Sequence, residues 1–182
     1  MLQPVCRGTP LAQLVVMQVD KLMTRDVVVC HPDDTLADAA RLMWDADIGA
    51  VVVVDPGGKL AGIVTDRDAC MAAYTRGLPL AEIPVSSVMA HEVWSCRVTA
   101  NCGDVEDVMR QHQVRRVPIV DASGRPVGIV ALNDLARAAR SAPSAAINQR
   151  EVETTLAAIS MPRHVPRTDE AFRALAIAGL TA

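Results

Sequence analysis

The chain repeats itself, without a gap, at a spacing of 66 residues. The segment GIVTDRD at 62–68 recurs as GIVALND at 128–134. Identical residues occupy equivalent places at Val19/Val85, Met23/Met89, Val27/Val93, Cys30/Cys96, Asp38/Asp104, Met43/Met109, Val51/Val117, Val54/Val120, Asp55/Asp121, Gly58/Gly124, Gly62/Gly128, Ile63/Ile129, Val64/Val130, Asp68/Asp134 and Ala72/Ala138. An ungapped repeat indicates one supersecondary unit built twice, with each copy needing the other to bury its apolar face. We therefore expect functional residues in the cleft between the copies.

Composition excludes several classes of function. The 182 residues are 51% hydrophobic but only 2% aromatic, so the core must consist of Val, Ala, Leu and Met. A net charge of −3 and scarce aromatic rings argue against nucleic-acid binding. No apolar run approaches the ~18–20 residues that span a bilayer, and we find no secretory signal. The five cysteines show no CxxC spacing, so we expect no disulfide framework, no metal site and a reducing cytoplasm.

The pattern within each copy predicts strand, helix, strand, strand and helix, an α+β fold. Apolar runs and turn residues place strands and helices in the first copy at 27–30, 33–47, 51–54, 60–64 and 66–74. Asp55-Pro56-Gly57-Gly58 is a turn between two of the strands. We divide the chain into an N-terminal extension (1–17), a first motif (18–76), a second motif (77–140) and a tail (141–182). Within the tail, 149–159 and 169–180 are predicted helices.

Thr65 and Asp68 lie where a strand of the first copy passes into its second helix. The unpaired N–H groups of a helix start attract phosphate, and an Asp there can accept hydrogen bonds from ribose hydroxyls. The same Thr-x-x-Asp spacing is also a capping box that stabilises the helix by about 1 kcal/mol. Both roles are compatible with the sequence.

Two adjacent arginines distinguish the second copy. Arg115 and Arg116 precede a buried strand, where the first copy has Gly49 and Ala50. Because successive strand residues face opposite sides, one arginine can point into the cleft while the other points to solvent or a partner. Guanidinium groups suit phosphate, although surface ion pairs would also explain them.

This double pattern resembles the pair of CBS motifs known as a Bateman module. The resemblance covers about residues 18–140 and depends on the Gly-hydrophobic-x-Thr/Ser-x-x-Asp/Asn element and on HQVRRVPIVD at 112–121. It implies two repeats related by a pseudo-twofold axis, each cleft binding an adenosyl ligand such as AMP, ADP or ATP. It also implies a homodimer in which two modules form a disc through their helices.

The resemblance assigns residues to two unequal clefts. In the first, Asp68 would hold the ribose, Thr65 and the arginines the phosphate, and Val93 with Val114 would flank the adenine. That cleft comprises Ile63, Thr65, Arg67, Asp68, Val93, Val114, Arg115 and Arg116. The second comprises Ile48, Gly49, Ala50, Ile129, Asn133 and Asp134. Ala131 there replaces the hydroxyl residue and no arginine precedes the strand. We therefore expect the first cleft to bind more strongly.

The sequence contains no catalytic arrangement that we can identify, so we predict a regulatory protein rather than an enzyme. It would bind an adenine nucleotide and signal occupancy to an effector protein through a change in conformation or dimer. One alternative is a structural CBS dimer without ligand. Another is a nucleic-acid binder using Arg115, Arg116, Arg163 and Arg167, which the acidic balance disfavours.

Overall fold

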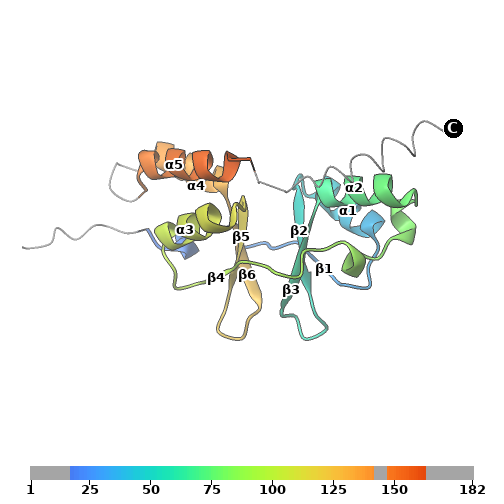
Figure 1. Cartoon of the computed structure of the whole chain (residues 1–182). Coiled ribbons are helices and arrows are strands. Elements are labelled where there is room, and N and C mark those ends of the chain that lie inside the picture. Colours follow the sequence, from blue (N-terminus) through green and yellow to red (C-terminus); the bar gives the residue numbers. More distant parts are fainter. Residues whose placement is uncertain (1–16, 142–146, 163–182) are drawn as a thin grey trace, which may run out of the picture.

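The computed structural model describes residues 17–141 and 147–162, and each copy folds as the predicted strand–helix–strand–strand–helix unit (Figure 1). We call the two copies repeat 1 and repeat 2. Repeat 1 contains β1 (Val29–Cys30), α1 (Leu36–Asp45), β2 (Ala50–Val54), β3 (Leu60–Thr65) and α2 (Asp66–Arg76). Repeat 2 contains β4 (Cys96–Arg97), α3 (Cys102–His112), β5 (Arg116–Val120), β6 (Pro126–Ala131) and α4 (Leu132–Ser141). Three short 3₁₀ turns are η1 (Val19–Lys21), η2 (Leu80–Glu82) and η3 (Val85–Ser87).

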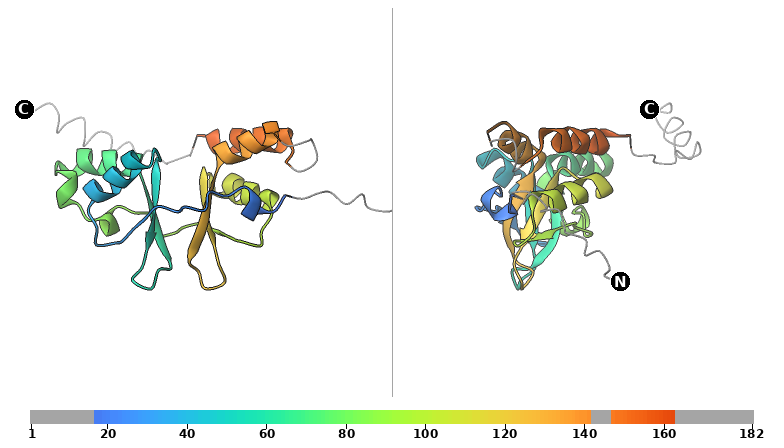
Figure 2. Two further views of the ribbon diagram at one scale, coloured as in Figure 1. Left: turned by 180° about the vertical axis from the view of Figure 1, so that it is seen from behind. Right: turned by 90° about the vertical axis from the view of Figure 1, so that its left-hand side faces the viewer.

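Each repeat forms a three-stranded sheet with the same pairing. The order is β1-β2-β3 in one and β4-β5-β6 in the other, with a parallel first pair and an antiparallel second pair. The registers also correspond, because Cys30 lies opposite Val53 and Cys96 lies opposite Ile119. All five residues of β2 are buried, as the unbroken valine run predicts. The two hairpins stand side by side with their turns at one end and the helices toward the other (Figures 1 and 2).

Three of the helices begin with a capping box, in which an acidic residue follows the cap residue by three positions. Thr35 caps α1 with Asp38, Thr65 caps α2 with Asp68, and Asn101 caps α3 with Asp104. In each box the side chain at the cap accepts from the backbone N–H three residues on, while the acid accepts from the N–H of the cap. The capping role predicted for Thr65 and Asp68 is therefore confirmed.

The two repeats exchange segments, in keeping with the predicted pseudo-twofold relation. The antiparallel bridge between Thr24 and Ile129 has its equivalent between Ala90 and Ile63. Val19 and Met23, which precede β1, are buried in the core of repeat 2. Val85 and Met89 are likewise buried in the core of repeat 1. Each core therefore includes the segment that precedes the first strand of the other repeat. This exchange explains why the unit occurs as a pair.

Gly62 marks the place where an exchanged segment crosses β3. A Cβ on Gly62 would lie 2.7 Å from the Met89 sulfur and 3.1 Å from the Ala90 carbonyl oxygen. The Ile63 amide donates to that carbonyl at 3.2 Å, and the Ala90 amide donates back to the Ile63 carbonyl at 2.9 Å. A side chain at position 62 would therefore push the crossing segment away.

α5 (Gln149–Ser160), predicted at 149–159, packs on α3 and α4 of repeat 2 (Figure 1). Its buried residues Val152 and Ile159 join the core of that repeat. The extension 1–16 and the predicted helix 169–180 lie outside the described residues. Among the helices of the described ranges, none has the length and apolar character to cross a membrane.

Candidate functional site

A cleft of about 250 Å³ lies between the repeats. All six residues predicted for the second site line it. Its walls come from the segment before β1, the start of β2, the end of β6 and the start of α4. The lining residues are Thr24, Asp26, Val27, Val28, Asp47, Ile48, Gly49, Ala50, Val52, Arg116, Ile129, Ala131, Asn133, Asp134 and Arg137. The predicted grouping of Ile48, Gly49 and Ala50 with residues from the other repeat is thus present in the structure.

Asp134 is the buried charge of this cleft. Only 8% of its surface is exposed, and its Oδ2 accepts from the Ala131 amide at 2.8 Å. Its Oδ1 is paired with the Arg137 guanidinium, whose own side chain is largely exposed. A carboxylate can accept about four hydrogen bonds, so these two partners leave acceptor capacity for a ligand. Asn133, beside it, is exposed.

Arg116 brings a guanidinium group from repeat 2 to the side of the second cleft that Gly49 and Ala50 of repeat 1 form. It begins β5, which stands beside β2 across the boundary between repeats, and it lines the cleft. Its Nη2 would lie 3.0 Å from a Cβ placed on Gly49. The absence of a side chain at Gly49 therefore makes room for this guanidinium. The expectation that the first cleft binds more strongly counted no arginine in the second cleft, whereas Arg116 reaches this cleft from β5.

The cleft combines three kinds of lining that a nucleoside phosphate needs. Val27, Val28 and Ile129 offer apolar surface for a planar base. Asp134 offers acceptors for hydroxyl groups, and Arg116 offers a cation for phosphate. Pockets with mostly apolar walls and a few placed polar groups are typical of small-molecule sites.

The residues predicted for the first cleft are more dispersed. Asp68 lines a shallow hollow of about 220 Å³ with Met71, Thr75 and Arg76. Val93 lines a different hollow, near the turns of the hairpins. Arg116 lines the second cleft and a groove beside α1 and α2. The geometry therefore does not support the expected meeting of Asp68 with Arg116.

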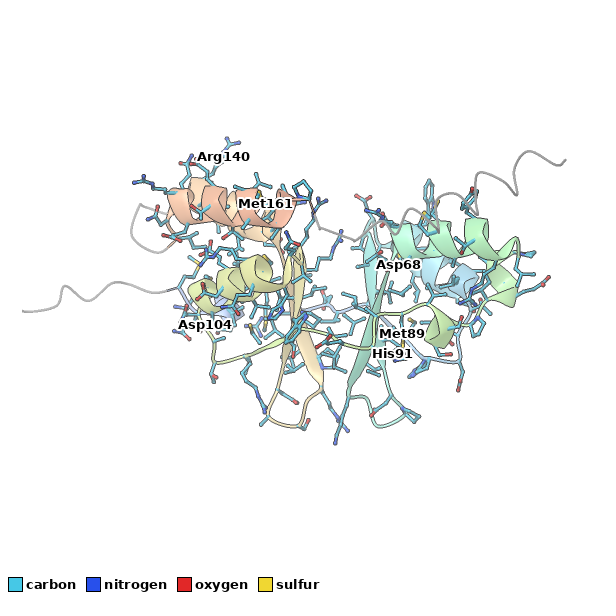
Figure 3. All side chains as sticks on the ribbon, viewed as in Figure 1. Asp68, Met89, His91, Asp104, Arg140 and Met161 are labelled. Carbon is cyan, nitrogen blue, oxygen red and sulfur yellow. The ribbon has the colours of Figure 1, made fainter. Side chains whose placement is uncertain are left out.

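The remaining residues of that set are placed by other contacts. Thr65 Oγ1 donates to Asp68 Oδ2 at 2.7 Å within the capping box, on the helix start that Figure 3 marks by Asp68. Ile63 is held in its backbone bridge to Ala90, and Val114 packs against the core of repeat 2. Arg67 and Arg115 are exposed.

Bulky side chains explain why the two clefts differ. Trp94 and His112 stand where repeat 1 has Val28 and Ala46. Their rings stack with centroids 3.5 Å apart and nearly parallel planes. Arg115 likewise stands where repeat 1 has Gly49. Val28 and Gly49 line the second cleft, whereas larger side chains hold the equivalent positions of the other repeat. The sequence showed this difference in size, but we interpreted the glycine and alanine only as missing phosphate ligands.

These features agree with a family match. The sequence model of the CBS domain matches twice, at residues 19–74 and 85–141. The chain belongs to the CBS domain family. The matches coincide with the two halves whose exchanged segments and equivalent bridges are described above. The resemblance inferred from the two motifs is confirmed.

Relatives of similar build are found in several organisms. The CBS domain-containing protein YhcV of Bacillus subtilis is 42% identical over 118 residues, which cover 65% of this chain and 82% of YhcV. Hypoxic response protein 1 of Mycobacterium tuberculosis is 32% identical over 116 residues, which cover 64% of this chain and 80% of that protein.

Solved structures show the same fold. A crystal structure of Hypoxic Response Protein I with two coordinated zinc ions has a TM-score of 0.61 at 30% identity and covers 66% of this chain and 98% of that one. The CBS pair of protein MJ0100, in complex with 5′-methylthioadenosine and S-adenosyl-L-methionine, has a TM-score of 0.64 at 24% identity, covering 69% of this chain and 98% of that one. Within the described part of this chain, no group of three or more His, Cys, Asp or Glu side chains could hold a metal ion.

Proposed function

We propose that this CBS pair is a regulatory module that binds an adenine nucleotide in the cleft lined by Gly49, Asp134 and Arg116. The observation that carries the proposal is the convergence of a buried carboxylate (Asp134), the guanidinium of Arg116 and an apolar wall on a single cleft between the repeats, with Arg137 paired to Asp134 at the same cleft. The base would lie against Val28 and Ile129. Asp134 would accept from the ribose hydroxyls, and Arg116 would face the phosphate.

The size of the cleft favours a mononucleotide. Its volume of about 250 Å³ is slightly below the roughly 300–1,000 Å³ that small-molecule sites span. AMP, ADP and ATP share the adenosine part, which is the part that this volume would hold. The MJ0100 pair, which has this fold, is described with two adenosine-containing ligands.

Occupancy would be sensed as a change between the repeats. The Asp66 amide donates to the Gly49 carbonyl at 3.4 Å, and the Leu132 amide donates to the Arg115 carbonyl at 3.0 Å. These bonds couple the start of each second helix to the strand beside the cleft. A ligand that contacts both repeats favours the arrangement that it fits best. The roles that we assign to Asp134 and Arg116 are to bind the ribose and the phosphate. We therefore propose a binding function and not a catalytic one.

We also infer a partner that reads this state, either a second copy or a separate effector protein. A disc in which α1–α4 all meet their counterparts would require α5 to be displaced, since α5 covers α3 and α4. In a homodimer, α5 would therefore form part of the contact. The described cysteines are free, which fits the cytoplasmic location that we propose.

Two measurements test the proposal. Mass spectrometry of small molecules released from protein purified without added ligand should recover an adenylate. A thermal-shift series with AMP, ADP, ATP, S-adenosylmethionine and guanosine nucleotides should raise the melting temperature for the adenine compounds alone, because binding to the folded state stabilises it. A shift of equal size with the guanosine nucleotides, or no shift with any compound, would refute the proposed specificity.

A further inference from the structure

α5 fills a groove between α3 and α4 of repeat 2. Val152, Thr155 and Ile159 on one side of α5 are buried there. At the end of the helix, Gln113 Nε2 donates to the Met161 carbonyl at 3.3 Å. A segment of the chain from outside the repeats thus completes one helical face of the molecule.

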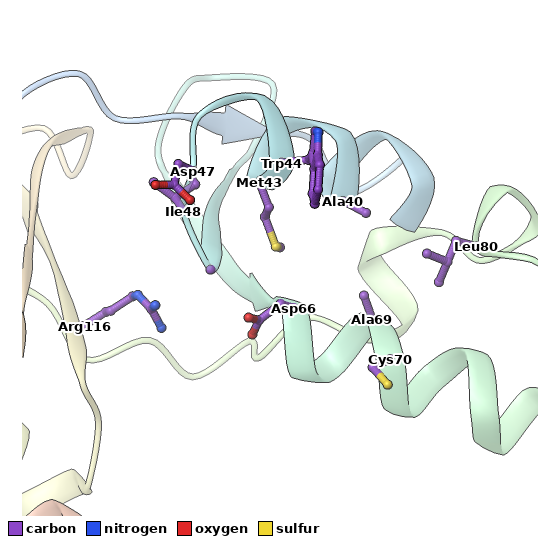
Figure 4. Close-up of a pocket in the computed structure, with 11 residues that line it drawn as sticks. Ala40, Met43, Trp44, Asp47, Ile48, Asp66, Ala69, Cys70, Leu80 and Arg116 are labelled. Carbon is purple, nitrogen blue, oxygen red and sulfur yellow. The ribbon is translucent and has the colours of Figure 1, made fainter.

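Repeat 1 has the equivalent groove between α1 and α2, with a volume of about 610 Å³ (Figure 4). We call it the α1/α2 groove. Met43 and Ala69 line it, and their equivalents Met109 and Leu135 are buried within repeat 2. Trp44, which also lines the groove, is 87% exposed. Among the described elements none lies over α1 and α2 as α5 lies over α3 and α4 (Figure 2).

We propose that residues 163–182 of the same chain fill the α1/α2 groove, as α5 fills its counterpart on repeat 2. The first reason is where α5 ends. Its last turn points toward the middle of the molecule, at Met161 (Figure 3). Gln113, which binds Met161, is three residues before Arg116, and Arg116 lines the α1/α2 groove. The chain therefore leaves α5 beside the end of the groove.

The second reason is the pattern of the segment itself. Phe172, Leu175, Ala176 and Gly179 recur at the spacing of one helical face, and 169–180 is a predicted helix. The residues between α5 and this helix, 161–168, include Pro162 and Pro166 and can span up to about 26 Å when extended. That length allows the predicted helix to reach across to repeat 1.

Charge provides a third reason. Two carboxylates, Asp47 and Asp66, and one guanidinium line the groove. Asp47 and Asp66 are exposed, and the described residues give neither of them an ion pair with Lys or Arg. The segment carries three arginines (Arg163, Arg167 and Arg173) and two acids (Asp169 and Glu170), which leaves its side chains a net charge of +1. Opposite charges at the rim of an apolar groove favour this occupant over an acidic one.

The fluorescence of Trp44 in the full-length chain tests the proposal. Replacing Trp94 by Phe leaves Trp44 as the single tryptophan, because the chain has two. In that background, Phe172→Asp and Leu175→Asp should shift the Trp44 emission to longer wavelength and increase its quenching by acrylamide. Ala174→Asp, on the opposite face of the predicted helix, should change neither. Within the groove, Cys70→Arg should reproduce the effect of Phe172→Asp, and Cys70→Ser should not.

Two results would overturn the proposal. Identical emission and quenching in the parent and in Phe172→Asp would show that the segment does not cover Trp44. A shift that appears on dilution, together with a halved molecular mass by light scattering, would show that a second copy covers the groove instead. Circular dichroism of each variant identifies any loss of folding, and the nucleotide thermal shift is expected to persist in all of them.

Discussion

Gly49 of repeat 1 lies against Arg116 of repeat 2. A Cβ at position 49 would be 3.0 Å from Arg116 Nη2 and 3.1 Å from Asp66 Oδ2. These atoms end flexible side chains, so they can shift by a few tenths of an ångström. This contact joins the strand of one repeat to the cation that we assign to the ligand of the shared cleft.

A larger side chain at position 49 should close the cleft. We expect Gly49→Leu to weaken nucleotide binding by at least about tenfold, equivalent to ~1.4 kcal/mol, because the side chain displaces Arg116. Gly49→Ala should fold normally and retain binding within a few fold. Calorimetric titration measures both variants. Full affinity in Gly49→Leu would place the ligand elsewhere.

The two neighbouring arginines should differ in their effects. Arg116→Ala should lower affinity for AMP by about tenfold and leave that for adenosine nearly unchanged, since a charge-assisted contact to phosphate stabilises by roughly 1.5–3 kcal/mol. Arg115→Ala, at an exposed position, is the matched control and should change neither affinity. Equal losses in the two variants would indicate a general charge effect rather than a phosphate site.

Glu106 should make the stability of repeat 2 depend on pH. Burial among α3 and α5 raises its pKa from 4.5 to about 7, and Oε1 has no hydrogen-bond partner. A carboxyl with a raised pKa in the folded state binds more protons there than when unfolded. The free energy of unfolding should therefore fall as pH rises from about 4.5 to 7, and then level off.

Glu106→Gln removes this dependence. The variant should be more stable than the parent at pH 8, by up to about 3 kcal/mol, and similar to it at pH 4. Urea unfolding at the two pH values measures the difference. The exposed neighbour Asp107→Asn provides the control, and a Glu106→Gln effect that is the same at both pH values would contradict the proposed titration.

Thr65 should contribute to stability rather than to binding. Its capping box with Asp68 is intact, and loss of such a cap costs about 1 kcal/mol. Thr65→Ala should lower the free energy of unfolding by that amount and leave nucleotide affinity unchanged. Thr35→Ala, at the equivalent cap of α1, should have a similar effect on stability. A selective loss of binding in Thr65→Ala would restore Thr65 to the ligand site.

The sequence predicted the fold well because its signals are local and occur twice. The valine run of β2, the capping box at Thr35 and the turn at Gly58 each specify one element, and the 66-residue spacing repeats them. The exchange of Val19 and Val85 between the cores was not predicted. It depends on how the halves pack, which periodicity within one segment does not report.

The sequence and the structure lead us to rank the two clefts differently. The residues of the second cleft come together as the motif implies. Sequence reasoning favoured the first cleft because it counted hydroxyl and guanidinium groups. It did not account for the stacked rings of Trp94 and His112, nor for Arg116 lying beside Gly49. Both depend on the direction of side chains across the boundary between repeats.

The effect of two matched substitutions on nucleotide affinity tests the assignment of the cleft most directly. Asp134→Asn and Asp68→Asn each remove one carboxylate charge at equivalent positions, and an amide oxygen can still accept at the helix start. Calorimetric titration with AMP should show a loss of tenfold or more, about 1.4 kcal/mol, in Asp134→Asn. Asp68→Asn should bind nearly as tightly as the parent. The opposite order, with Asp68→Asn losing affinity and Asp134→Asn retaining it, would show that the nucleotide occupies the other cleft.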